Sequence, residues 1–232
     1  MTSWQAAGPG IWRREYSFGN NPMNTIAVDM GDGGLMAISP GTGLKDADFD
    51  ALDALGDVRA LVSPGAFHHM GMPAWSARYP DAEIFGPTGA PEHIAKQHKS
   101  LRAVQPLSAL EALLTDDIEV GELAGCKFPD IFLALRRDGE VTWFSNEILT
   151  NFLDYPPSFM FRTVFKLFGT HPGLNVNTLA AMLIRAKKPV VRSYLEGKLE
   201  SAPPTRLVPV HGGVLEDPDL ATKIGEVLAR RF

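Results

Sequence analysis

Short apolar or alternating runs, separated by turn-forming residues, fill the chain up to residue 145. Runs of about four to eight residues that are rich in β-branched and aromatic side chains predict β-strands. Asp-Gly and Gly-Gly pairs between such runs predict tight hairpins, because glycine tolerates the positive φ that these turns require. The expected strands are residues 12–18, 25–30, 33–39, 58–63, 82–85, 117–123, 130–136 and 140–145.

Apolar residues at helical spacing occur between these strands. Phe49, Leu52 and Leu55 recur every three residues after an acidic first turn, which predicts a helix over 46–55. The remaining expected elements are helices ending near residue 79 and over 91–98, 178–187, 190–199 and 218–231, and a strand at 207–210. Because strands and short helices alternate in two series, the pattern favours two sheets with helices outside over one doubly wound sheet.

The composition changes after residue 151, where we predict a helical insertion that extends to about residue 203. The stretch 158–168 places phenylalanines and a valine on one helical face, and Arg162 and Lys166 on another. Such a helix suits a lid, a homodimer interface, a position on a membrane surface or packing on the domain's own core. These alternatives stay open from the sequence alone.

Composition and charge narrow the class of protein. The chain has 232 residues, 45% of them hydrophobic, so we expect a single domain over 1–232. A net charge of −5 without a basic stripe disfavours a nucleic-acid partner or an anionic membrane surface, and favours a small-molecule or protein partner. Because no signal-peptide pattern and no apolar run of roughly 18 residues is present, we expect a soluble, cytoplasmic protein.

Three groups of titratable residues follow predicted strand ends. His68 and His69 come after the strand at 58–63, Glu147 after the strand at 140–145, and His211 after the strand at 207–210. Loops at strand ends are where α/β scaffolds hold ligand-binding groups. Imidazole and carboxylate are common metal ligands, so the pattern favours a metal site assembled from distant segments.

Other reactive residues have simpler interpretations. His93 and His98 lie in a Glu-, Lys- and Gln-rich helical stretch and are expected to be solvated. Cys126, the single cysteine, excludes an intrachain disulfide and is expected to be a small buried side chain. A nucleophilic pair of Cys126 with His211 stays open as an alternative.

The order of these motifs resembles the metallo-β-lactamase-like hydrolase superfamily. Members of that superfamily carry T-H-x-H-x-D-H after a strand, a downstream His, an Asp after a later strand and a His near the C-terminus. Residues 63–69, SPGAFHH, occupy the first motif, with Pro64 and Ala66 at its leading histidines and His68 at its aspartate. The resemblance implies an αββα sandwich, in which two mixed β-sheets pack face to face with helices outside.

The resemblance also implies which half of a two-metal site is retained. The ligands of the first metal are lost, unless Cys126 replaces the downstream histidine. The positions that hold the second metal contain His68, His69, Glu147 and His211. We therefore expect one divalent metal, with Zn preferred and Fe or Mn as alternatives. His68 or Glu147 would act as general base if it is not a ligand.

Three functions follow from this resemblance. The first is a mononuclear metal-dependent hydrolase of a small ester, thioester or lactone. The second is a non-catalytic descendant of the fold that binds no metal and holds a ligand or protein under the 151–203 insertion. The third is an enzyme that uses a single iron in an oxygenase-type reaction.

Overall fold

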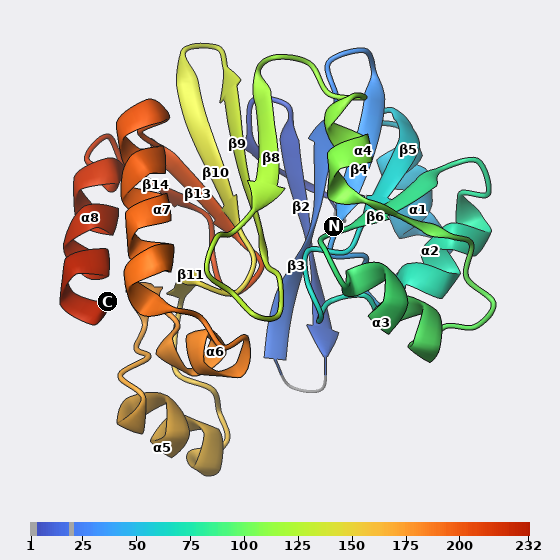
Figure 1. The fold of residues 1–232 in the computed structure, drawn as a ribbon. Coiled ribbons are helices and arrows are strands. Elements are labelled where there is room, and N and C mark those ends of the chain that lie inside the picture. Colours follow the sequence, from blue (N-terminus) through green and yellow to red (C-terminus); the bar gives the residue numbers. More distant parts are fainter. Residues whose placement is uncertain (1–3, 19–20) are drawn as a thin grey trace.

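The chain folds into two β-sheets that pack face to face with helices on both outer sides, as Figure 1 shows for this computed structural model. The structure describes residues 4–18 and 21–232. One sheet has seven strands in the order β1 to β7, and the other has five in the order β14-β13-β10-β9-β8. This architecture confirms the αββα sandwich that the motif order implied.

The seven-stranded sheet begins as a meander and continues as parallel strands. Its antiparallel part comprises β1 (Gln5–Gly8), β2 (Ile11–Phe18), β3 (Asn21–Asp29) and β4 (Gly34–Ile38). Its parallel part adds β5 (Asp57–Val62), β6 (Glu83–Gly86) and β7 (Val104–Pro106). The crossovers are α1 (Asp46–Asp53), α2 (Met72–Arg78) and α3 (Ala90–Gln97). Each parallel strand therefore ends at the edge where its crossover begins.

The five-stranded sheet joins a hairpin to a late parallel strand. Its strands are β8 (Ile118–Glu122), β9 (Ile131–Arg137), β10 (Glu140–Ser145), β13 (Arg206–Pro209) and β14 (Leu215–Glu216). Short helix α4 (Leu107–Glu111) connects the two sheets, and α7 (Lys188–Ser201) and α8 (Leu220–Arg231) lie outside the second sheet. Strands β10 and β13 run parallel, although about 60 residues separate them.

Three apolar clusters hold these layers together. One fills the space between the sheets, with Ile26, Val62 and Leu133 fully buried. Another lies between the seven-stranded sheet and its helices around Trp75, and the third joins the five-stranded sheet to α7 and α8 around Trp143. Burial of each large apolar side chain stabilises the fold by roughly 1.5–3 kcal/mol, so the layers fix the strand ends firmly.

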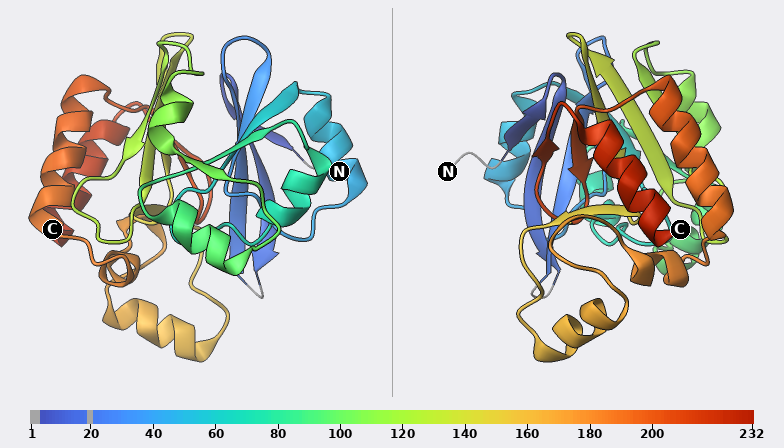
Figure 2. Two further views of the ribbon diagram at one scale, coloured as in Figure 1. Left: turned by 45° about the vertical axis from the view of Figure 1, so that its right-hand side comes forward. Right: turned by 90° about the vertical axis from the view of Figure 1, so that its left-hand side faces the viewer.

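The segment between β10 and β13 contains strands as well as helices. Strands β11 (Leu149–Phe152) and β12 (Gly173–Val176) pair antiparallel, and the helices are α5 (Phe159–Leu167), α6 (Thr178–Leu183) and α7. The predicted helical insertion is therefore of mixed structure. Its strands were not predicted, because a four-residue strand is too short to show a periodic pattern. Helix α7 buries Val191 and Leu195 in the core, whereas α5 stands away from the sandwich (Figure 2).

No helix within residues 4–18 and 21–232 combines the length and the apolar character that crossing a membrane requires.

Candidate metal centre

The loop after β5 carries His68 across the ends of both sheets. The Ser63 hydroxyl donates a hydrogen bond to the Gly65 carbonyl at 2.9 Å, and Gly65 forms an isolated bridge with Asp130 at the start of β9. His68 has a φ of 61°, a left-handed conformation that a non-glycine residue rarely adopts. Such backbone strain persists where surrounding contacts hold it and is common at functional sites.

Glu147 and His211 come from neighbouring parallel strands. Glu147 lies two residues after β10 and His211 two residues after β13, so both follow the same edge of the sheet. The Val210 amide donates to the Ser145 carbonyl at 2.9 Å and keeps the two chains adjacent beyond the ladder. The parallel pairing thus brings together two residues that are 64 positions apart in the sequence.

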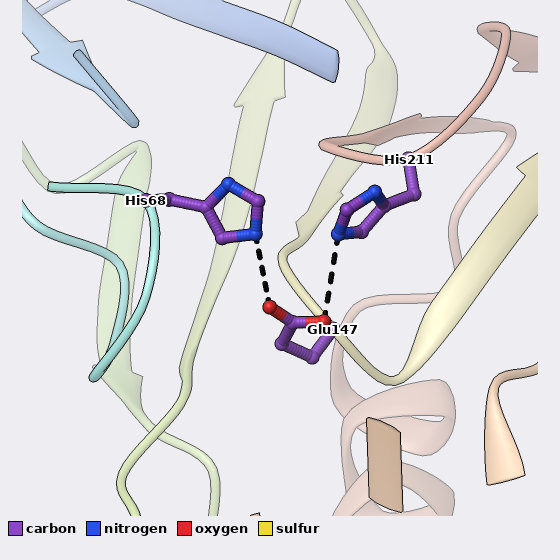
Figure 3. Close-up of side chains that lie close together, drawn as sticks. All are labelled: His68, Glu147 and His211. Carbon is purple, nitrogen blue, oxygen red and sulfur yellow. Dashed lines mark hydrogen bonds and ion pairs between the residues drawn. The ribbon is translucent and has the colours of Figure 1, made fainter. Parts of the chain in front are cut away.

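The three side chains converge on one small region, as Figure 3 shows. His68 Nε2 lies 2.9 Å from Glu147 Oε1, and His211 Nε2 lies 3.5 Å from Glu147 Oε2. One ligand atom from each residue can be chosen so that all three lie within 4.8 Å of one another. They line a cavity of about 510 Å³, and the apolar residues Phe67, Met70 and Leu183 also line it. A ligand in this cavity therefore reaches all three polar groups.

Glu147 and Asp130 are neighbouring buried carboxyl groups whose pKa values shift in opposite directions. Burial raises the pKa of Glu147, but hydrogen bonding to His211 and His68 outweighs it and holds that pKa well below its usual range. Burial, together with the Glu147 charge, raises the pKa of Asp130 to about 8. Asp130 accepts hydrogen bonds from the Asn146 side chain at 2.6 Å and from the Glu147 amide at 3.2 Å. It therefore anchors the loop that carries Glu147.

The donor set fits one divalent metal. Two imidazole nitrogens and one carboxylate oxygen match both three-ligand catalytic zinc sites and the two-histidine, one-carboxylate set of iron enzymes. The Tyr16 hydroxyl lies 3.4 Å from His68 Nδ1 and 3.3 Å from the Ser39 hydroxyl, so it orients the His68 ring with Nε2 toward Glu147. Metal-binding histidines characteristically have such a partner on their second nitrogen.

His69 does not join this group. Its Nδ1 lies 3.0 Å from His98 Nε2, and its ring packs edge-on against His93 with centroids 5.5 Å apart. Burial, with the adjacent His98 and His93, lowers the pKa of His69 to about 4, so the ring is neutral at physiological pH. The four residues predicted as ligands thus divide into three that converge and one that turns away.

The expectation that His98 is solvated needs correction on the same evidence, whereas His93 is exposed as expected. His98 is half-buried and paired with His69, and His93, although exposed, lies against the His69 ring and lines the cavity. The polar background of this helical stretch concealed that α3 turns these rings toward the loop after β5. His98 is the C-cap of α3, where the chain leaves the helix and can approach another segment.

Cys126 contributes neither a ligand nor a nucleophile to this group. It forms an isolated bridge with Ala186 and packs against the apolar cluster under α7. Burial raises the pKa of its thiol to about 12, which keeps it protonated and poorly nucleophilic. Cys126 thus packs as a small apolar side chain, although it is half-buried rather than buried as expected, and this position gives no support to a pair with His211.

Comparison with known proteins identifies the fold. Solved structures that match nearly end to end include DIM-1 metallo-β-lactamase, with a TM-score of 0.61 at 13% identity over 99% of this chain and 97% of that chain. A metallo-β-lactamase from Pontibacter korlensis matches with a TM-score of 0.61 at 14% identity, over 97% of this chain and 98% of that one. FIM-1 from Pseudomonas aeruginosa, solved in a mono-zinc form, matches at 0.58 and 13% identity, over 98% and 94%.

The chain therefore has the metallo-β-lactamase fold, as the motif order implied. No protein-family model matches the sequence, and no curated protein does either. Identities near 13% establish the architecture and leave the chemistry to be argued from the residues of this chain.

Proposed function

We propose that the protein is a mononuclear metal-dependent hydrolase of a small ester, thioester or lactone. The observation that supports this best is the convergence of His68, Glu147 and His211, from three separate strand ends, within 4.8 Å of one another at a cavity. Zinc is the preferred metal for this donor set, with iron or manganese as alternatives.

The residues of this chain have distinct roles in that proposal. His68 and His211 present Nε2, and Glu147 presents a carboxylate oxygen to the metal. A divalent metal held there supplies Lewis-acid activation of water and of a carbonyl oxygen. The low pKa of Glu147 keeps it ionised, so its second oxygen would orient the attacking water by accepting a hydrogen bond from it. The apolar lining of the cavity excludes bulk water from the reacting groups.

The donor set gives specific support to a second candidate as well. Two histidines and one carboxylate also form the face that mononuclear iron enzymes use to activate oxygen. Oxygen consumption by iron-loaded protein with a thiol substrate would favour that candidate. A non-catalytic role would be favoured by protein that binds no metal and still binds a ligand in the cavity.

The test measures metal and activity together. Protein purified without chelator is analysed for Zn, Fe and Mn, then assayed on 4-nitrophenyl acetate, a phenyl thioacetate and a γ-lactone. We expect about one metal per chain, loss of metal in His211→Ala, and at least a 100-fold loss of kcat/KM in Glu147→Gln.

His171→Ala is the matched control, because His171 lies in a loop and its Nδ1 faces the Pro172 carbonyl. It should leave metal content and activity unchanged. Protein that stays inactive on all three substrates after loading with each metal would overturn the hydrolase proposal.

A further inference from the structure

A second cavity of about 420 Å³ opens from the same centre. It shares Glu147 and His211 with the first cavity, as well as Met23, Ala180 and Leu183. A molecule held at the two polar residues can therefore extend in two directions, and the second cavity leads beneath α5. The site is thus larger than a small ester needs.

The wall of the second cavity is mainly apolar on the side of α5. Phe161 and Phe165 of α5 line it, together with Leu153 and the Pro156-Pro157 turn. The Phe152 ring lies between α5 and the centre, 5.3 Å from Phe165 and 6.1 Å from His211 between ring centroids. A continuous aromatic surface therefore runs from the candidate catalytic group to the helix.

Several polar residues of this cavity already have partners, among them Asp154, whose Oδ1 accepts a hydrogen bond from the Tyr155 amide. Arg13 pairs with the side chains of Gln5 and Asn24, and Asn177 caps α6 by accepting from the Ala180 amide. A polar ligand would gain few free partners on the α5 side. An apolar chain would instead remove these rings from water, and each buried methylene contributes about 0.8 kcal/mol to such binding.

Helix α5 buries none of its side chains fully against the rest of the chain. All its residues are described, and none of them is buried. Phe161 is 45% exposed, and Leu153 beside it is 82% exposed. Natural domains rarely leave so many large apolar side chains together in water unless a ligand or partner covers them. Because this surface is continuous with the catalytic cavity, the substrate is the occupant that the geometry favours.

We propose that the substrate is an ester or thioester with a medium- to long-chain apolar acyl group, and that this group lies in the second cavity beneath α5. This inference rests on the proposed hydrolase function. Water adds to the acyl carbon and the C–O or C–S bond breaks. A carboxylic acid forms, and one proton of the water passes to the leaving alcohol or thiol.

The test is a chain-length series on the metal-loaded full chain. The substrates are 4-nitrophenyl acetate, butyrate, hexanoate, octanoate and decanoate. We expect kcat/KM to rise with each added methylene, by up to about fourfold per carbon, through octanoate. Phe161→Asp should lower the ratio of octanoate to acetate activity by at least tenfold, since it places a charge on the acyl path.

Leu113→Asp is the matched control. Leu113 is 46% exposed, much like Phe161, and it lines neither of the two cavities. This variant should keep both activities and their ratio. Circular dichroism and thermal melts on both variants separate a loss of acyl preference from a loss of folding.

Three outcomes overturn the inference, and they differ from failure of the proposed function. If 4-nitrophenyl acetate is hydrolysed and kcat/KM does not change with chain length, the proposed hydrolase function stands and the acyl-binding role of the second cavity is wrong. If no ester is cleaved, the proposed hydrolase function is wrong, and calorimetry with decanoate then tests the cavity separately. Absence of decanoate binding to the wild-type protein would show that the second cavity does not hold an acyl chain. A dimer that Phe161→Asp converts to monomer, with the octanoate-to-acetate ratio unchanged, makes α5 a subunit interface instead.

Discussion

His68 and His69 are adjacent in the sequence, yet their side chains belong to two different groups of residues. His68 faces Glu147 at 2.9 Å, whereas His69 faces His98 at 3.0 Å. The left-handed φ of 61° at His68 turns the chain between them, so consecutive side chains diverge. The result is one group with a carboxylate and a separate group of imidazoles.

This divergence predicts that substitutions of the two adjacent histidines change the affinity for metal by very different amounts. His68→Ala should lower the affinity for Zn²⁺ at least 100-fold, because it removes one of three convergent donors. His69→Ala should change the affinity less than about threefold, because its Nδ1 faces His98 and it is not among the three convergent donors. Competition with a chromophoric chelator measures both. Equal losses in the two variants would show that His69 is a ligand.

Tyr16 should act on the metal through His68. Its hydroxyl lies 3.4 Å from His68 Nδ1 and is buried, with a pKa raised by that burial. Tyr16→Phe removes the partner that orients the ring, and we expect about a 10- to 100-fold loss of metal affinity. Tyr194→Phe is the matched control, because Tyr194 of α7 packs against Phe132 of β9, outside the candidate site. An unchanged affinity in Tyr16→Phe would contradict an orienting role.

Asp130 should make the metal-free protein less stable as the pH rises. Its folded pKa of about 8 lies above the ordinary value near 4, so between these values the native state holds a proton that the unfolded chain has released. The free energy of unfolding should therefore fall by about 1 kcal/mol from pH 7 to pH 8. Urea unfolding in EDTA measures this slope.

Asp130→Asn should flatten that slope, since asparagine does not titrate. Asp57→Asn, at an exposed position at the start of β5, should leave it unchanged. His69 does not obscure the measurement, because its pKa of about 4 leaves it neutral in the native state over this range, and the unfolded imidazole is mostly neutral there too. A slope that is equal in wild type and Asp130→Asn would rule out a protonated Asp130.

The sequence predicted the elements that hold the candidate site better than the contacts within it. Predicted strand ends at 63, 145 and 210 were visible as short apolar runs, and the residues that follow them, His68, Glu147 and His211, do converge in the structure. The separation of His69 depends on one backbone angle, which no residue-type pattern encodes at a histidine. The hydrophobic pattern of the sequence therefore located the loops that carry the candidate ligands, but it did not give the direction of each side chain.

Tyr16 and Asp130 were missed for a related reason. Tyr16 is one of several inward residues of a strand that reads as ordinary sheet, and its partner His68 is 52 positions away. Asp130 follows a proline and was expected to be only the first residue of an apolar strand, whereas its side chain is a buried acid. Both act through tertiary contacts, and only the packing of the two sheets reveals them.

Gly212 should be essential to the position of His211, whereas its neighbour Gly213 should not. Gly212 has a φ of +107°, and a Cβ there would collide with the Asn151 carbonyl oxygen, which is rigid backbone. The one tight contact of a Cβ at Gly213 would be with the end of the exposed Leu153 side chain at 3.0 Å, which can move, and the Asn151 Nδ2 would lie at an ordinary 3.8 Å. We expect Gly212→Ala to cost about 1–3 kcal/mol of stability and at least tenfold in metal affinity. Gly213→Ala should stay within about twofold of wild type, and similar effects of both substitutions in melting and metal titration would refute this placement.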